Sequence, residues 1–148
     1  MTIAQTSTTS FKVELFQAVH NFGPTTPNTF KIALYTAASD IGPATTAYTA
    51  TNEVVGTGYT AGGNTLAIST GPTSGNNDAS IPTAFVSFSN TSWASSSITA
   101  RGALIYNSTQ GNKSVAVLDF GADKTTANAT FLITFPAADA SSAIVRIS

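Results

Sequence analysis

Short runs of Val, Ile, Phe and Tyr, separated by turn-forming residues, constrain the fold of this chain more than any other feature. In the first run Phe30, Ile32 and Leu34 alternate with Lys31, Ala33 and Tyr35, which is the period of a β-strand. From residue 84 on the runs begin 12 to 17 residues apart, with no helical pattern between them, which favours a mainly β fold, an antiparallel β-sandwich or jelly roll. The runs are FKIALYT (30–36), AFVSFSN (84–90), RGALIYN (101–107), SVAVLDFG (114–121), TFLITFP (130–136) and SAIVRIS (142–148), with separators such as NSTQGNK and GADKTTANA.

One N-terminal segment departs from this pattern. In SFKVELFQAVHNFGP the residues Phe11, Leu15, Val19 and Phe22 follow one another at steps of four, four and three, as on one face of a helix. Ser10 is a suitable N-cap, and the Gly-Pro pair at 23–24 ends the pattern. We expect one amphipathic helix at about 11–22, with its apolar stripe on the sheet.

The domain organisation follows from length. A chain of 148 residues is the size of one domain, so we expect a single β-rich domain at 11–148 behind a polar arm at 1–10. The arm, in which Ile3 is the only sizeable apolar residue, is either disordered or laid against another surface. The segment 70–83 is the most loop-like and is expected to be an exposed tip or an interface loop. Neither a signal peptide nor a membrane-spanning run is expected.

The chain carries unusually little charge. Asp, Glu, Lys and Arg supply 9% of the residues and the net charge is −1, whereas soluble domains average about 25% charged residues. We therefore expect no nucleic-acid or membrane partner. Ser and Thr make up about 28% of the sequence. A polar, uncharged surface favours close packing against neighbouring proteins, because few ions are desolvated on contact.

The glycine-rich stretch NEVVGTGYTAGGNT at 52–65 raises the question of a phosphate-binding loop. A Walker loop requires Gly-Lys-Ser/Thr, but Gly62 and Gly63 are followed by Asn64. A dinucleotide fingerprint requires a helix after the glycines, but NTLAIS reads as a strand. We interpret the stretch as a turn with positive φ angles or a bulge, with Tyr59 packed over it.

The titratable residues do not combine into the set of groups that a catalytic site needs. We therefore predict that the chain is not an enzyme and has no catalytic, cofactor-binding or metal-binding residues. DFG at 119–121 lacks the other kinase motifs. Asp119 and Asp123 could bind Ca²⁺ but more readily cap turns. His20 is the only histidine and is expected to complement the dipole at the helix C-terminus rather than act as a base.

The remaining candidates also have structural interpretations. Arg101 and Arg146 lie within apolar strands and are expected to form edge or inter-subunit ion pairs rather than an anion site. No basic groove accompanies the phenylalanines, so a shared core is expected rather than a base-stacking platform. These are Phe11, Phe16, Phe22, Phe30, Phe85, Phe88, Phe120, Phe131 and Phe135.

Six segments together resemble a family of small virion structural proteins of tailed bacteriophages. The resemblance runs from about residue 10 to the end, without the 70–83 segment, and is most specific in the glycine stretch and in the pair RGALIYN and SVAVLDFG. It implies a non-enzymatic, β-rich component of a phage particle. The segments are SFKVELFQAVHNF, NTFKIALYTAA, TNEVVGTGYTAGG, RGALIYN, SVAVLDFG and FPAADASSAIVRI.

We expect, more specifically, a capsid decoration, or cement, protein. This expectation rests on the size of the domain, its uncharged surface and its polar arm. Such a subunit would bind the major capsid protein and copies of itself, as a trimer or dimer, on the outer surface of the head. One alternative is a tail, baseplate or fibre-associated subunit. A second alternative is a carbohydrate-binding module for host attachment that stacks a sugar ring on Trp93, Tyr59 or Tyr106, although a single Trp more often lies in a core or interface.

Overall fold

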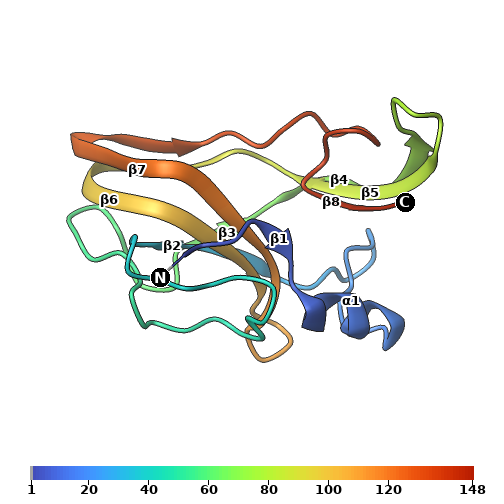
Figure 1. The fold of residues 1–148 in the computed structure, drawn as a ribbon, viewed down its shortest axis with the longest axis horizontal. Coiled ribbons are helices and arrows are strands. Elements are labelled where there is room, and N and C mark those ends of the chain that lie inside the picture. The colour runs from blue at the N-terminus through green and yellow to red at the C-terminus, as the bar shows by residue number, and fades with distance from the viewer. Residues whose placement is uncertain (1) are drawn as a thin grey trace.

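A computed structural model describes residues 2–148 as two antiparallel sheets and one short helix (Figure 1). With 48% of residues in strands and 5% in the helix, the fold is mainly β, as predicted. The elements are β1 (Thr6–Ser7), α1 (Thr9–Phe16), β2 (Phe30–Tyr35), β3 (Asn64–Leu66), β4 (Ile68–Asn76), β5 (Pro82–Phe88), β6 (Thr91–Asn107), β7 (Lys113–Ile133) and β8 (Val145–Ile147).

The two sheets differ in size and in how their strands are connected. The larger sheet has five strands in the order β1-β7-β6-β2-β3, and the smaller has three in the order β4-β5-β8. β1 and β8 are therefore edge strands of different sheets. In Figure 1 the long β6–β7 ribbon extends to one side, and the smaller sheet lies above α1 on the other.

The two longest strands, β6 and β7, form one hairpin. The sequence patterns predicted two separate strands, at 114–121 and 130–136, within what is the single strand β7. β6 pairs with β7 from Thr91↔Ile133 at its open end to Asn107↔Lys113 beside the turn. The GADKTTANA segment, predicted to separate two strands, instead runs inside β7, so this prediction is wrong. Gly121 (φ 74°) and Asn128 (φ 47°) adopt left-handed conformations there. Register shifts near these residues absorb the extra backbone as bulges, so the strand continues.

The 70–83 segment is also more regular than predicted. Residues 70–76 belong to β4 and residues 82–83 to β5, and the two strands pair as a hairpin from Ile68↔Phe88 to Asn76↔Pro82. The Asn77 side chain closes the turn, because its Oδ1 accepts hydrogen bonds from the Ala79 and Ile81 N–H groups. The exposed tip that we expected is present, but it is the end of a hairpin rather than a loop.

The core covers both faces of the larger sheet. Phe30, Ile32 and Leu34 of β2 belong to the main hydrophobic cluster, which also contains residues of the smaller sheet. Ala33 and Tyr35 belong to a second cluster. Because side chains alternate across a strand, the two clusters lie on opposite faces. The segment between β2 and β3, including Ile41 and Tyr48, therefore covers the face of the sheet opposite the main cluster.

Helix α1 is shorter than the predicted 11–22. It begins after Thr8, whose side chain accepts from the Phe11 N–H, so Thr8 rather than Ser10 is the N-cap. It ends because Ala18 has φ 56°. The Ala18 N–H bonds to the Leu15 carbonyl and the Val19 N–H to the Glu14 carbonyl, the two bonds of a Schellman motif. The apolar stripe is thus divided: Phe11 and Leu15 are helical, whereas Val19 and Phe22 follow the cap.

The polar arm packs on the chain's own larger sheet. Thr6 and Ser7 pair with Val117 and Ala116 of β7, and Ile3 is buried. The Ala4 N–H donates to the Ile41 carbonyl. Residues 2–8 are thus held by the same chain rather than extended toward a neighbour. Across the described residues 2–148, no helix has the length and apolarity that a membrane crossing needs.

Candidate functional site

The glycine stretch forms a tight connection into β3, as its composition predicts. Gly58, Gly62 and Gly63 all have positive φ angles, and Asn64 then begins β3 rather than a helix. At Gly63 a Cβ atom would overlap the Ile32 carbonyl oxygen of β2. Glycine is required there because two backbones meet, not because a phosphate must approach.

The buried carboxylate of Glu53 organises this connection. Its Oε1 accepts the Tyr59 hydroxyl at 2.6 Å and the Gly62 N–H at 2.7 Å, and its Oε2 accepts the Tyr48 hydroxyl at 2.7 Å. The residue is 7% exposed and forms no ion pair among the described residues. Three donors therefore replace the water that burial removes. A carboxylate occupied in this way locks a loop and is not free to abstract a proton from a substrate.

The four tyrosines gather at this carboxylate and on the sheet behind it. Burial, and then the hydrogen bond and charge of Glu53, raise the pKa of Tyr48 to about 12 and raise that of Tyr59 further. Burial and the same charge raise the pKa of Tyr106 to about 12, and burial chiefly raises that of Tyr35. Each phenol is thus held neutral and serves as a hydrogen-bond donor.

The only histidine lies in a second polar network rather than at the helix end. His20 is four residues beyond the last residue of α1, so the predicted contact with the helix dipole is wrong. Its Nε2 donates to Glu14 Oε2 at 2.8 Å, and its Nδ1 accepts from Asn107 Nδ2 at 3.0 Å. Both ring nitrogens are occupied, so His20 has no nitrogen free to act as a general base in this arrangement.

Glu14 joins this network to the β6–β7 turn. Burial alone raises the pKa of Glu14, but hydrogen bonds from Lys113 and His20, together with the charge of Lys113, lower this pKa by more than burial raises it. The Lys113 Nζ lies 2.7 Å from Glu14 Oε1. The carboxylate is therefore held ionised, as the bridge between α1, the segment after it and β7.

Asp119, Arg101 and Arg146 form hydrogen bonds with other residues of the same chain. Asp119 Oδ1 accepts the Gly121 N–H at 2.9 Å and the Arg101 Nε–H at 3.2 Å. The capping interpretation is therefore confirmed for Asp119, and the ion pair of Arg101 forms within one chain. Arg146 donates to the Ala143 carbonyl. Asp123 is exposed, and residues 2–148 hold no group of three or more His, Cys, Asp or Glu residues that could bind a metal.

The aromatic side chains mostly form the core, as predicted, with one clear exception. Trp93 is 4% exposed and packs against Tyr59 and Phe131. Its Nε1–H has no acceptor among residues 2–148, so packing alone holds the indole. Tyr106 is buried as well, and neither ring offers an open face to a sugar. The exception is Phe16, which is 95% exposed on α1.

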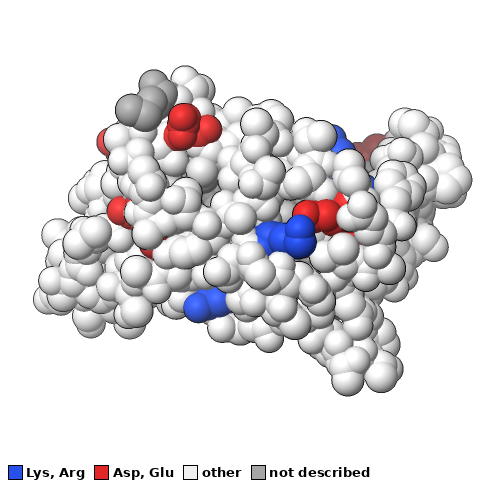
Figure 2. Space-filling view, turned by 90° about the horizontal axis from the view of Figure 1, so that it is seen from below, with Lys and Arg blue, Asp and Glu red and all other residues white. Residues whose placement is uncertain are grey.

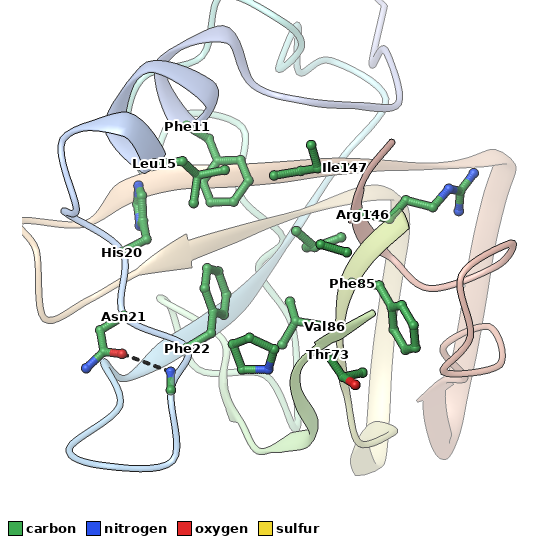
Figure 3. Close-up of a pocket in the computed structure, with 14 residues that line it drawn as sticks. Phe11, Leu15, His20, Asn21, Phe22, Thr73, Phe85, Val86, Arg146 and Ile147 are labelled. Carbon is green, nitrogen blue, oxygen red and sulfur yellow. Dashed lines mark hydrogen bonds between the residues drawn. The ribbon is translucent and has the colours of Figure 1, made fainter. Parts of the chain in front are cut away.

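An apolar groove beside Phe16 is the best candidate for an interaction site. It has two connected parts, of about 350 and 540 Å³, that share Phe11, Leu15, Arg146 and Ile147. In Figure 3 Phe11 and Leu15 of α1 face Ile147 of β8 across the hollow, while the Arg146 side chain extends outward from β8. Leu15 is half-buried and Ile147 is exposed. The groove therefore combines apolar surface with a partly open backbone edge.

Sequence reasoning missed the two buried carboxylates and this groove. Glu53 is the only charged residue between Asp40 and Asp78, which is the signal that could have identified it. Glu14 lies three residues after Phe11, on the side of α1 that the structure buries. The groove carries no such signal, because its lining comes from α1, β4, β5 and β8, which lie far apart in sequence.

Comparisons with known proteins give no relative: no protein-family model, no curated protein and no solved structure matches the chain.

Proposed function

We propose that this chain is a non-enzymatic structural subunit of a bacteriophage particle, and that it acts as a capsid decoration protein. In this role it binds the outer surface of an assembled head, contacts the major capsid protein and copies of itself, and stabilises the shell. The resemblance of its sequence motifs to small phage virion proteins is the starting point for the proposal. The observation that carries it further is the character of the exposed surface.

That surface is almost free of charge and contains isolated apolar side chains. Figure 2 shows one face on which a few charged groups are scattered over a wide uncharged area. Phe16 and Val55 are more than nine-tenths exposed, and Leu132 and Ile147 are more than half exposed. Burying such a surface against a protein lattice desolvates few ions and gains apolar contact. An interface of about 800 Å² per partner, repeated over a shell, would resist expansion of the head without any chemistry.

The internal polar groups support a structural role in a second way. Glu53, Glu14, His20 and Asp119 are each committed to hydrogen bonds or ion pairs within the chain. These contacts join segments far apart in sequence, such as α1 and β7. These titratable groups thus stabilise the domain by joining its segments, which is the arrangement expected of a rigid building block.

The two alternatives differ in their support. A tail, baseplate or fibre-associated subunit would use the same surface and differs only in copy number and location. A carbohydrate-binding module has less support, because the burial of Trp93 and Tyr106 removes two of its three candidate stacking residues. We therefore keep the tail location as the second candidate.

The first test is the number of copies per particle. Quantitative mass spectrometry of purified virions, with the major capsid protein as internal standard, should give a ratio of one to a small integer. A dozen copies or fewer would move the subunit to the tail. Its absence from the particle would overturn the proposal as a whole.

The stabilising role has its own test. Particles lacking the subunit should release their DNA at a lower temperature than complete particles, as followed by a DNA-binding dye during heating. Adding the purified protein back should restore the release temperature. Equal release temperatures with and without the subunit would contradict the cement role even if the copy number is high.

A further inference from the structure

A hollow is lined by β1 of the larger sheet and by the segment that leads into β8 of the smaller sheet. β1 is an edge strand of the larger sheet and β8 is an edge strand of the smaller one. Gln5, Thr6 and Ser7 line a cavity of about 340 Å³ together with Ser142, Ala143 and Ile144, which precede β8, and with Arg146 of β8. Edge strands present unpaired N–H and C=O groups that can accept a further strand. β8 has such a free edge on the side away from β5.

This hollow continues into the apolar groove between α1 and β8. Ser7 and Arg146 line both the hollow and the larger part of the groove, which Phe11, Leu15, Phe16 and Ile147 complete. The whole surface lies along β8, from Ser7 at one end to the segment after α1, which includes Phe22, at the other. An extended segment lying there would meet the free edge of β8 and the two apolar parts of the groove, and a backbone edge with side-chain pockets is what recognition by strand addition uses.

The charge on this surface indicates what the segment carries. Lys12 and Arg146 are exposed at the groove, and neither forms a salt bridge among the described residues. None of the residues that line the hollow or the two parts of the groove is Asp or Glu. In a chain with so few charges, two cations in a groove that no Asp or Glu lines favour a ligand that brings carboxylates.

We propose that the α1–β8 groove binds an extended segment of another protein that alternates apolar and acidic residues and adds a strand at the free edge of β8. A two-fold contact between two copies of this chain fits less well, because it would bring Lys12 and Arg146 of one copy toward the same residues of the other. The inference rests on the proposed function insofar as the segment would belong to the capsid lattice.

The experiment starts from an unbiased library of 12-residue peptides selected on the purified protein. We expect the enriched peptides to alternate apolar with Asp or Glu residues. Fluorescence polarisation with one labelled peptide then measures affinity. K12E and R146E should each weaken binding about tenfold or more, a change of about 1.4 kcal/mol. K124E changes an exposed lysine outside the groove and serves as the matched control.

Two further comparisons test the apolar and backbone contributions. Phe16→Ser should weaken binding, whereas Val55→Ser, which removes an equally exposed apolar side chain outside the groove, should not. Both positions are exposed, so neither variant removes a core contact. Two peptides methylated at alternate backbone nitrogens test the strand pairing. Methylation of the N–H groups that face β8 should abolish binding, whereas methylation of the N–H groups on the opposite edge of the peptide should leave binding unchanged.

Several outcomes would overturn the inference: no enriched peptide, a basic consensus, or equal binding by the R146E and wild-type proteins. Sedimentation equilibrium at several protein concentrations tests the rival occupant. Self-association that Phe16→Ser abolishes would assign the groove to a second copy and also overturn the inference. These measurements need no virion, so a failure here remains distinct from a failure of the copy-number test.

Discussion

Tyr59 connects the glycine stretch to the central sheet through one oxygen atom. Its hydroxyl donates to Glu53 Oε1 at 2.6 Å and accepts the Leu34 N–H of β2 at 2.9 Å. The second bond pairs a backbone N–H that the sheet itself leaves open. Glu53 therefore stabilises both the loop and the sheet, and its substitution tests how much the buried polar cluster contributes.

Glu53→Ala is expected to lower the free energy of unfolding by about 3 kcal/mol, because it leaves the Tyr59 hydroxyl and the Gly62 N–H without an acceptor. Glu53→Gln should cost only about 1 kcal/mol. Its amide oxygen can accept both donors, and its NH₂ group can donate to the Tyr48 hydroxyl. Urea denaturation gives both values. Asp123→Ala, at an exposed acid, is the control; equal losses in Glu53→Ala and Asp123→Ala would contradict the role of the cluster.

The tyrosines make stability depend on alkaline pH. Their pKa values in the folded chain lie above the ordinary value of 10.0, at about 12 for Tyr48 and Tyr106 and higher for Tyr35 and Tyr59. The folded state therefore binds more protons than the unfolded state above pH 10.0, so the stability from this effect is complete below that pH and falls as pH rises toward 12. Tyrosinate absorbance should rise together with the loss of folded circular dichroism. Gradual ionisation in a chain that stays folded would contradict this prediction.

Gly63→Ala should destabilise the chain by at least about 3 kcal/mol, since its Cβ would overlap the β2 backbone. Gly111→Ala is the matched control. Gly111 has φ 67°, close to the φ 68° of Gly63, but a Cβ there meets open space. The control should cost about 1 kcal/mol from the backbone conformation alone. Thermal unfolding of the two variants separates these effects, and similar losses would show that the close approach is unimportant.

Ala18→Gly is expected to stabilise the chain by about 0.5–1 kcal/mol, because glycine relieves the left-handed conformation at the end of α1. Ala37→Gly, at an exposed turn position without a positive φ angle, should instead cause a small loss. Differential scanning calorimetry can measure both shifts. A loss of stability in Ala18→Gly would contradict the Schellman end of the helix.

The strand-rich half of the fold was predictable where side-chain periodicity is local. The runs at 30–36 and 101–107 became β2 and the inner part of β6, because their alternation fits a sheet covered on both faces. The polar strands were not predictable. Ser, Thr and Asn in SWASSS and DKTTANA have no apolar period, and they are strands because β6 and β7 pair with each other.

The candidate site shows the same division. The turn at Gly62–Gly63 followed from missing motif elements next to it in the sequence. The hydrogen-bond donors to Glu53 could not be predicted in this way, because Tyr48 and Tyr59 reach the Glu53 carboxylate only after the loop has folded onto β2. The helix end was predicted too late because Ala18 adopts a conformation that its side chain disfavours.

The position of β1 against β7 has a kinetic consequence. Thr6 pairs with Val117, and Phe30 pairs with Asn107. Strands near the start of the chain therefore pair with strands that are synthesised much later. Contacts of such long sequence separation close large loops before they gain any stabilising energy. Folding should therefore start in the local β6–β7 and β4–β5 hairpins and finish with β1, on the millisecond-to-second timescale of all-β domains.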